Sequence, residues 1–438
     1  MRIAVVGAGY IGAVLSAVLA DKGFSVTAID VNSKLIEIYN KGWSPFKEPG
    51  LEELIKKVVS EGYLTASTDI SRISDADVIL ITVGTPLSKD GSADKSAIKS
   101  AVNSMKPFIK DDQLIILKST VPPFTTENDV AKPLRKYAKV QVAFCPERLA
   151  EGNAINECKK IPVVVGGIDE ESSIKAENFW KKSLDIDCIR VQNAESAELV
   201  KLADNAWIDL NISLAFELAK VADNMKVDVL PIIKAVNSLP KGDSFVNVLL
   251  PSIGVGGYCL TKDPYFLDAF AKKYNSSFKT AITSRLVNEE SPLYAVRRLD
   301  EALSIQYPES DKNKIQIGIL GVSFKNNTGD CRNTPTLPAI KELLNIGYKL
   351  KVFDPYVNKK DFLKFKNIER VFSINEVMSN SNAIAFFAGH KEFHNITIKD
   401  LKESLISGAV IFDGRMYFSE EKILSFKEAG FVFKGIGR

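Results

Sequence analysis

The sequence predicts an α/β protein in which two doubly wound domains are joined by a helical middle domain with one long helix. Three observations support this fold class. Short apolar runs alternate with amphipathic segments over residues 1–190, a helical pattern continues unbroken from residue 194 to residue 226, and the alternation resumes after residue 314. Strands that alternate with helices favour a parallel sheet covered on both faces, so we expect domains at residues 1–192, 193–307 and 308–438.

The elements of the first domain follow from the spacing of its apolar residues. Segments 11–22 and 51–60 have the amphipathic pattern of helices. Apolar or β-branched runs bounded by turn residues predict strands, at residues 3–6, 26–29, 78–82, 114–118, 140–144 and 162–165.

The rest of the chain first becomes helical and then alternates again. The pattern over 194–226 is much longer than an average helix, and a long helix of this kind is a candidate dimer surface. The polar stretch 308–314 reads as a linker. Further helices are expected at 229–237, 265–274 and 281–307, and strands of the last domain at 315–320, 350–353, 383–387, 409–412 and 431–433.

The overall composition excludes several classes of protein. A chain of 438 residues that is 45% hydrophobic and 25% charged is typical of globular domains. Its 57 Lys and Arg against 54 Asp and Glu give no basic excess for nucleic acid, so we expect no nucleic-acid partner. No apolar run reaches about 18 residues, so we expect no membrane span.

Cysteine and histidine usage points to free thiols and to no metal. The number of cysteines is odd and none form a C-x-x-C pair, which favours a reducing, cytoplasmic compartment. Two histidines provide too few ligands for a catalytic zinc ion. These residues are Cys145, Cys158, Cys188, Cys259 and Cys331, with His390 and His394.

A glycine-rich turn follows the first expected strand. Gly7-Ala8-Gly9-Tyr10-Ile11-Gly12 is a G-x-G-x-x-G motif that opens a helix, whose N-terminal N–H groups suit a pyrophosphate. Asp30 ends the next strand, where a carboxylate meets ribose hydroxyls and repels a 2′-phosphate. The pattern therefore predicts a Rossmann-type domain that binds NAD in preference to NADP. A flavin, or a nucleotide-free turn with Asp30 as a helix cap, are the alternatives that this motif alone leaves open.

A second segment of interest is Gly256-Gly257-Tyr258-Cys259-Leu260-Thr261-Lys262-Asp263. If the residues after Cys259 begin a helix, Cys259 and Asp263 share one helical face. A thiol near a helix start and a cation is a usable nucleophile. The alternative is a small packed cysteine beside a turn, which is commoner for a lone cysteine.

Several motifs in one order resemble the UDP-glucose/GDP-mannose dehydrogenase family. The glycine motif and the cysteine segment are joined by six further stretches and one arginine that are similar to that family's, spread over nearly the whole chain. They are Gly84-Thr85-Pro86, Ser119-Thr120-Val121-Pro122, Pro146-Glu147-Arg148-Leu149-Ala150-Glu151-Gly152, Glu198-Leu199-Val200-Lys201-Leu202-Ala203-Asp204-Asn205, and, in the last domain, Gly321-Val322-Ser323-Phe324-Lys325 with Arg332 and Phe412-Asp413-Gly414-Arg415.

The resemblance implies a four-electron oxidation of the C6 alcohol of a UDP-sugar to a uronic acid, with NAD as cofactor. Cys259 would capture the intermediate aldehyde as a thiohemiacetal and then carry a thioester. Lys201 and Asn205, one turn apart on a helix, would face the developing oxyanion. Asp263 and Glu147, with Thr120, would position or deprotonate water.

The remaining site residues are also implied by the resemblance. Each isolated cation among them has the alternative reading of an ordinary surface charge. The cofactor contacts are Gly7, Gly9, Tyr10, Ile11, Gly12, Asp30, Thr85, Thr120, Glu151 and Arg332. The substrate contacts are Glu147, Arg148, Leu149, Lys201, Asn205, Asn211, Asn247, Gly256, Lys325 and Arg415.

Two positions favour a 2-acetamido sugar over glucose. Glucose-type members carry Pro-Glu-Phe-Leu where this chain has Arg148, and a lysine where it has Asn211. Both changes resemble the branch that oxidises UDP-N-acetylmannosamine or UDP-N-acetylglucosamine, and the epimer stays open. Tyr258 and Lys262 are more glucose-like, and Phe245 stands where the acetamido branch has an arginine.

Two rival functions remain at this stage. A non-catalytic nucleotide-sugar binding protein would not need Cys259, Lys201, Asn205 and Asp263 together. A 6-phosphogluconate-like or 2-hydroxy-acid dehydrogenase needs neither the cysteine nor a second α/β domain. We therefore expect a UDP-sugar dehydrogenase that forms a homodimer or a higher homo-oligomer.

Overall fold

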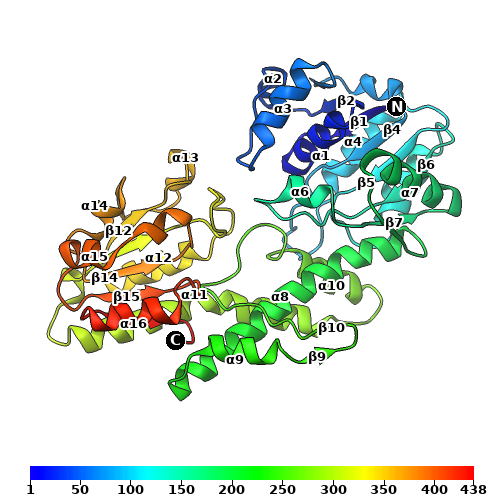
Figure 1. Ribbon diagram of the computed structural model, residues 1–438. Coiled ribbons are helices and arrows are strands. Elements are labelled where there is room, and N and C mark those ends of the chain that lie inside the picture. Colours follow the sequence, from blue (N-terminus) through cyan, green and yellow to red (C-terminus); the bar gives the residue numbers. More distant parts are fainter. The chain divides into compact units, whose positions relative to one another are not determined.

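The computed structural model describes residues 1–438 and divides them into two compact units. The first unit comprises Met1–Asn205 and Tyr265–Ser277, and the second comprises Ala206–Pro264 and Phe278–Arg438. Each unit contains one large sheet with helices packed on it (Figure 1). The α/β class with two doubly wound sheets is therefore confirmed, whereas the division of the chain at residues 192 and 307 stays a prediction.

The sheet of the first unit has eight strands. Their order is β3-β2-β1-β4-β5-β6-β7-β8, so the chain starts in the middle and winds outward in both directions. Every strand expected from the sequence is present, and β3 and β8 are additional. The strands are β1 (Arg2–Val6), β2 (Ser25–Ile29), β3 (Leu64–Ser67), β4 (Val78–Ile81), β5 (Leu114–Leu117), β6 (Gln141–Phe144), β7 (Val163–Gly167) and β8 (Cys188–Arg190).

Successive residues of the central strands enter two different cores. In β1, Ile3 and Val5 belong to one apolar cluster, whereas Ala4 and Val6 belong to the cluster on the opposite face. Side chains alternate across a strand, so a continuous apolar run fills both faces of a sheet that is covered on both sides. This explains why these strands carry no polar alternation in the sequence.

Two strands at one edge of the sheet, β7 and β8, run against the parallel direction that the alternation predicted. β7 pairs with β6 in antiparallel register, Ala143 opposite Gly167, while β7 and β8 are parallel to each other. The connection from β6 to β7 contains only the short helix α6 (Ala154–Cys158). We attribute the reversal to this connection, which does not carry the chain back to the amino edge of the sheet before β7 begins.

The helices of the first unit cover its sheet. The glycine motif opens α1, in which Gly12 to Ala20 are all buried. Phe270 of α10 and Tyr274, which follows this helix, form an aromatic cluster with Phe124. The helices are α1 (Tyr10–Asp21), α2 (Ser33–Asn40), α3 (Leu51–Ser60), η1 (Ile70–Asp75), α4 (Ser96–Met105), the π-helix η2 (Thr126–Ala131), α5 (Lys132–Leu134), α6, α7 (Glu170–Leu184) and α10 (Asp263–Lys272).

The large sheet of the second unit repeats the same winding, and all of its strands are parallel. Its sheet has the order β13-β12-β11-β14-β15-β16. The strands are β11 (Gln316–Leu320), β12 (Lys349–Phe353), β13 (Glu369–Arg370), β14 (Ala383–Phe386), β15 (Val410–Asp413) and β16 (Val432–Gly435). The helices packed around it include α12 (Thr336–Ile346), α13 (Lys359–Phe362), α14 (Ile374–Met378), η4 (Lys391–Asn395), α15 (Ile398–Ser404) and α16 (Glu420–Glu428).

The helical middle of the chain is built on two long helices. α8 (Ala194–Met225) confirms the long helix expected from the sequence, and α11 (Lys279–Gln306) is almost as long. Within the second unit, the buried Arg285 of α11 donates to Asp209 of α8 at 2.6 Å, which locks the two helices together. Smaller elements are α9 (Val229–Val236), the hairpin β9 (Pro240–Lys241) with β10 (Ser244–Phe245), and η3 (Lys312–Lys314) inside the expected linker. None of the helices offers a stretch both long and apolar enough to cross a bilayer.

Candidate active site

The glycine turn after β1 is shaped by close approaches of the backbone. Gly7 has a φ of +100°, and a Cβ there would lie 2.9 Å from the Thr82 carbonyl carbon. A Cβ on Gly12 would lie 2.0 Å from the Gly7 oxygen. A side chain at either position would therefore open the turn. Gly9 has open space around its Cβ position, which leaves room for a ligand above the start of α1.

Asp30 braces this turn from the end of β2. Its Oδ2 accepts from the Ala8 N–H at 2.8 Å, and its Oδ1 accepts from the Asn32 N–H at 2.9 Å. On the other side, the buried Tyr39 hydroxyl donates to the Ala8 oxygen at 2.8 Å. The carboxylate is half-buried and held beside the glycine turn. This arrangement of turn, helix start and carboxylate fits the pyrophosphate and ribose of NAD.

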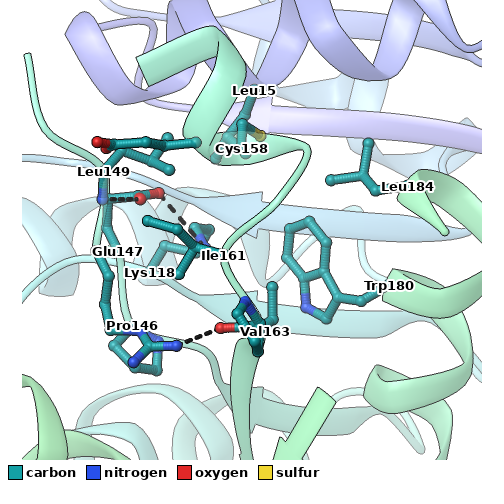
Figure 2. Close-up of a pocket in the computed structure, with 13 residues that line it drawn as sticks. Leu15, Lys118, Pro146, Glu147, Leu149, Cys158, Ile161, Val163, Trp180 and Leu184 are labelled. Atoms are coloured by element: carbon teal, nitrogen blue, oxygen red, sulfur yellow. Dashed lines mark hydrogen bonds and ion pairs between the residues drawn. The ribbon is translucent and has the colours of Figure 1, made fainter. Parts of the chain in front are cut away.

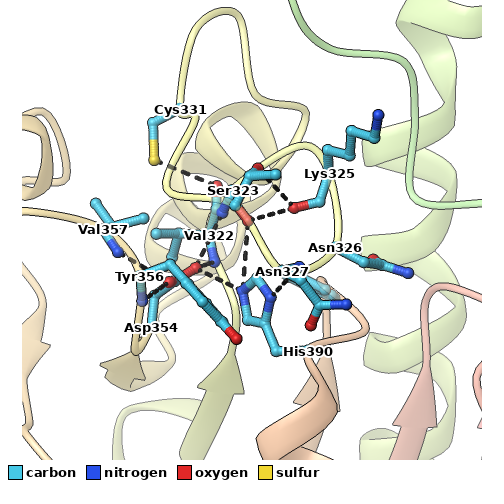
Figure 3. A network of polar contacts seen from close by, with 12 residues as sticks. Val322, Ser323, Lys325, Asn326, Asn327, Cys331, Asp354, Tyr356, Val357 and His390 are labelled. Atoms are coloured by element: carbon cyan, nitrogen blue, oxygen red, sulfur yellow. Dashed lines mark hydrogen bonds and ion pairs between the residues drawn. The ribbon is translucent and has the colours of Figure 1, made fainter. Parts of the chain in front are cut away.

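In the second unit a carboxylate at a strand end also accepts from a glycine turn, but here a histidine lies against it (Figure 3). Gly321 follows β11 with a φ of +87°, and the Val322 N–H donates to Asp354 Oδ2 at 2.7 Å, as Ala8 does to Asp30. Here, however, His390 Nε2 lies 3.1 Å from the same Asp354 oxygen, and both side chains are fully buried. Burial opposes ionisation of Asp354, but its hydrogen bonds with His390 and with backbone N–H groups outweigh burial and lower the pKa of that carboxyl.

His390 also fixes the loop that follows β11. Its Nδ1 accepts from the Asn327 N–H at 2.8 Å, and its Nε2 lies 3.4 Å from the Ser323 hydroxyl. The Lys325 carbonyl accepts from the hydroxyls of Ser323 and Thr328. In this unit the carboxylate at the strand end therefore orders the loop that carries Lys325, and it is not presented to a ribose.

Two threonine loops meet at the carboxyl ends of β4 and β5. The buried Thr85 hydroxyl donates to the Thr120 oxygen at 2.7 Å, and the Ser119 hydroxyl donates to the Val83 oxygen at 2.7 Å. Thr85 and Thr120, both expected at the site, are thus brought together. The carboxyl ends of parallel strands are where α/β sheets bind ligands.

The loop after β6 holds Glu147 by a buried ion pair (Figure 2). Glu147 Oε1 accepts from the Leu149 N–H at 2.9 Å, and Oε2 lies 3.5 Å from Lys118 Nζ. The Lys118 ammonium sits 4.8 Å from the centre of the Trp180 ring. The Arg148 guanidinium donates to the Pro162 oxygen.

These side chains line a small cavity of about 30 Å³. Lys118 was missed by sequence reasoning, although it directly precedes the Ser119-Thr120 motif.

Lys201 and Asn205 lie on one face of α8, as their spacing predicted. Lys201 Nζ is 3.5 Å from Asn205 Oδ1, and both side chains are buried. One turn earlier, the buried Glu198 accepts from the N–H and the hydroxyl of Thr126 at 2.7 and 2.6 Å. Glu198 therefore ties the π-helix that follows the Thr120 loop to the start of α8.

The cysteine loop packs on the Phe324 ring of the second unit. A Cβ on Gly256 would lie 2.3 Å from Phe324 Cβ, and one on Gly257, at a φ of +83°, 2.8 Å from Phe324 Cζ. The Gly257 N–H donates to the Arg332 oxygen at 2.9 Å. Both glycines are therefore required by this close approach.

Cys259 is exposed and precedes a helix. α10 begins at Asp263, so Cys259 lies in the turn before it and not on its face, contrary to the condition considered from the sequence. The Asp263 N–H nevertheless donates to the Cys259 oxygen at 2.9 Å, which fixes the four-residue relation between them. The Asp263 side chain is buried and pairs with Lys262.

The basic side chains of the second unit differ in their partners. Arg332 pairs with Asp330 and lies over the Tyr258 ring at 4.9 Å. Arg415 donates to the carbonyl oxygens of Phe387 and Phe324 at 2.8 and 2.5 Å, and burial lowers its pKa to about 10. A guanidinium whose acceptors are neutral carbonyls keeps its charge for an anionic ligand such as a phosphate.

Asn211 is engaged with a neighbouring backbone segment. Its Nδ2 donates to the Asn247 oxygen at 2.6 Å, and its Oδ1 accepts from the Leu249 N–H at 2.7 Å. Asn211 and Asn247 are thus brought together, with Asn247 exposed. One N–H and one lone pair of the Asn211 amide stay available to a ligand.

Comparison with protein families matches three models in chain order. The descriptions are "UDP-glucose/GDP-mannose dehydrogenase family, NAD binding domain" for residues 1–184, the same family's "central domain" for 195–290, and its "UDP binding domain" for 318–420. These models carry the same family name as the resemblance seen in the motifs.

Individual relatives cover the whole chain. A UDP-N-acetyl-D-mannosamine dehydrogenase from Methanocaldococcus jannaschii is 32% identical, over 96% of this chain and 93% of its own. The structure of the corresponding Pyrococcus horikoshii enzyme is 32% identical, with a TM-score of 0.88 over 100% of this chain and 99% of its own. A UDP-glucose dehydrogenase from Pyrobaculum islandicum is 26% identical, with a TM-score of 0.86 over 100% and 97%.

Proposed function

Because this chain belongs to the UDP-glucose/GDP-mannose dehydrogenase family and is an NAD-dependent nucleotide-sugar dehydrogenase, we propose that it oxidises the C6 alcohol of UDP-N-acetyl-D-mannosamine to the uronic acid. The observation that carries the choice of sugar is the full-length similarity to relatives named for that sugar at 30–33% identity. Arg148 and Asn211 support a 2-acetamido sugar independently, because neither is the residue of the glucose-type pattern.

The proposed route has two oxidations and one hydrolysis. The C6 alcohol loses a hydride and its hydroxyl proton to give an aldehyde, and the Cys259 thiol adds to that carbon as a thiohemiacetal. Loss of a second hydride and of the hydroxyl proton leaves a thioester, which water cleaves to the carboxylate and the restored thiol. NAD supplies the acceptor for both hydrides, so one sugar and one water give two NADH.

The protein's own residues would stabilise charge and move protons in this route. Lys201 and Asn205, buried and 3.5 Å apart, are proposed to donate to the oxyanion that forms at C6. Glu147 and Asp263, each held by a lysine partner, are the carboxylates proposed to position or deprotonate water, together with Thr120. Because Cys259 must stay reduced to act, we propose the cytosol as its compartment.

The binding roles are proposed for each unit separately. In the first unit, Gly7, Gly9, Tyr10, Ile11, Gly12, Asp30, Thr85 and Glu151 would contact NAD, with Arg148 and Leu149 on the substrate side. In the second, Lys325 and Arg415 would hold the diphosphate, with Asn211, Asn247 and Gly256 on the substrate side and Arg332 on the cofactor side. We keep residues 1–192, 193–307 and 308–438 as the proposed NAD-binding, central and UDP-binding domains.

A homodimer is the proposed assembly, formed through α8. Large apolar side chains at helical spacing remain exposed along one face of this helix, which is unusual for a surface that stays in water. Twofold dimers are the commonest homo-oligomers. The side chains are Trp207, Leu210, Leu214, Val221 and Met225.

A panel of UDP-sugars tests this function. NADH formation is measured with UDP-N-acetylmannosamine, UDP-N-acetylglucosamine and UDP-glucose, and the total NADH is counted per mole of limiting sugar. We expect the highest kcat/KM with UDP-N-acetylmannosamine and two NADH per sugar. A highest kcat/KM with UDP-glucose would instead support the second candidate, a UDP-glucose 6-dehydrogenase, which Tyr258 and Lys262 favour. One NADH per sugar would refute the thioester route.

A further inference from the structure

Glu48 is a buried carboxylate that lies outside every motif considered above. It is only 6% exposed, and it stands in the segment between α2 and α3. Its Oε2 accepts from the Tyr10 hydroxyl at 2.6 Å and from the Gly152 N–H at 2.6 Å. Its Oε1 accepts from the Ala154 N–H at 2.8 Å. Three donors from two distant parts of the first unit therefore converge on one side chain.

The first of these parts is the glycine turn. Tyr10 is the first residue of α1 and directly follows Gly9, above which the backbone leaves room for a ligand. Its ring packs edge-on against Phe46 with centroids 5.8 Å apart. Burial, and then the hydrogen bond to Glu48, raise the pKa of Tyr10 far above its ordinary value, so its hydroxyl stays a donor.

The second part is the end of the loop that carries Glu147, Arg148 and Leu149. Gly152 ends this loop with a φ of +92°, and α6 begins at Ala154. The N-cap of α6, Asn153, makes no side-chain cap, so Glu48 provides the anionic acceptor at the first turn of this helix from elsewhere in the chain. The position of the loop end is thus set by the position of Glu48.

We propose that Glu48 is a positioning residue that couples the cofactor turn to the substrate loop, so that occupation of the turn at Tyr10 tightens the binding of the nucleotide sugar. The inference rests on the proposed role of the 146–152 loop in holding substrate. A ligand that fixes Tyr10 fixes Glu48 through one hydrogen bond, and Glu48 fixes the Gly152 and Ala154 N–H groups through two more. Coupling of this kind is reciprocal, so the bound sugar raises the affinity for the cofactor by the same factor.

Calorimetric titration of the sugar measures the coupling without turnover. UDP-N-acetylmannosamine is titrated into the enzyme alone and into the enzyme saturated with NADH, which cannot accept a hydride. We expect NADH to lower the Kd of the sugar about tenfold in the wild type, within the usual range of coupling between sites. Tyr10→Phe removes only the hydroxyl and leaves the contacts of Glu48 with the loop, so the ratio should fall below about twofold. The Kd without NADH should barely change.

Two further variants make the result specific. Tyr39→Phe also removes a hydroxyl that touches the glycine turn, at Ala8, but no contact leads from Tyr39 to Gly152, so the tenfold ratio should persist. Glu48→Gln has one acceptor oxygen for three donors. It should therefore abolish the effect of NADH on the Kd of the sugar, and it should also weaken sugar binding in the NADH-free enzyme. In steady state, Glu48→Gln should raise the KM of the sugar and keep kcat.

Opposite outcomes are also well defined. The inference would be overturned if NADH did not change the Kd of the sugar in the wild type. It would also be overturned if NADH lowered that Kd as much in Tyr10→Phe and Glu48→Gln as in the wild type. Failure of the proposed sugar would look different, because UDP-glucose would then bind better in both cofactor states while the ratio kept its value.

Discussion

At the scale of single residues, Cys259 separates covalent catalysis from a structural thiol. Cys259→Ser keeps a hydroxyl of similar size, but serine is a far weaker nucleophile towards the aldehyde. We expect the variant to fold, to bind NAD and UDP-sugar, and to lose uronate formation by at least about a thousandfold. A slow first hydride transfer can survive, because that step needs a base and not the thiol. Uronate is measured by chromatography of the quenched reaction.

Exposure makes Cys259 chemically distinct from the other four cysteines, which provides the control. Burial raises the pKa of Cys145, Cys158 and Cys331 to about 12 and that of Cys188 to about 11, so these thiols are protonated at pH 8. One equivalent of iodoacetamide should therefore modify Cys259 first and inactivate the enzyme, and bound UDP-sugar should protect it. Cys188→Ser should be fully active. Near-normal uronate formation by Cys259→Ser would show that the Cys259 thiol takes no covalent part in catalysis.

Asp30 is expected to set the choice of cofactor. Its carboxylate lies beside the glycine turn, where it would accept from ribose hydroxyls and repel a 2′-phosphate. Asp30→Ala should raise the KM for NAD by roughly tenfold or more, and it should reduce the preference of the enzyme for NAD over NADP. The ratio of kcat/KM for the two cofactors measures this. A wild type that prefers NADP would contradict the assignment.

At the scale of elements, local patterns predicted more than long-range contacts did. Gly7, Gly12 and Asp30 lie in one strand–turn–helix–strand unit, so their spacing in the sequence already fixed their relation. Asp354 could have been found in the same way, because it ends the strand after Gly321. His390 could not, since its contact with Asp354 depends on how β14 is placed beside β11. The reversed β7 was missed for the same reason, because strand direction depends on the path of a connection.

The burial of Glu198 beside the π-helix gives stability a pH dependence. Burial raises the pKa of Glu198 from 4.5 to about 8. A carboxyl whose folded pKa is raised favours folding fully below pH 4.5, and this contribution is lost as the pH rises through about 8. Glu198→Gln keeps an acceptor for Thr126 and cannot ionise. Relative to the wild type, its free energy of unfolding should therefore rise between pH 5 and pH 8.5, by on the order of 3 kcal/mol.

Urea unfolding at a series of pH values measures this difference. Glu217→Gln, at an exposed position of the same helix, controls for the removal of a carboxylate and should show no such rise. A difference between Glu198→Gln and wild type that stays constant with pH would show that Glu198 folds without a penalty for its charge.

At the scale of the whole molecule, the α8 face predicts assembly. Leu214 is 46% exposed in the middle of the apolar stripe, so it would be buried in a dimer formed there. Leu214→Glu would place a charge in that interface. Burial of an unpaired charge costs about 3 kcal/mol or more, so the dimer should be destabilised by that amount. Light scattering should give the wild type at least twice the chain mass of 48.2 kDa and the variant a value near one chain.

A matched control lies on another helix. Leu424 is 57% exposed on α16, away from the stripe, and Leu424→Glu should leave the mass of the wild type unchanged. A dimer that survives Leu214→Glu would place the interface elsewhere.

The buried His390–Asp354 pair has a consequence for the timing of the reaction. Asp354 is buried against His390, whereas Asp30 is half-buried beside a turn that leaves room for a ligand. We therefore expect each chain to bind one dinucleotide at a time, although the proposed route consumes two. The spent cofactor must therefore leave and a fresh one must arrive while the sugar is only half oxidised. During that exchange an unattached aldehyde would be free to escape into the medium. In the proposed route the covalent bond to Cys259 holds the half-oxidised sugar on the enzyme, so NADH can be exchanged for NAD without loss of the intermediate.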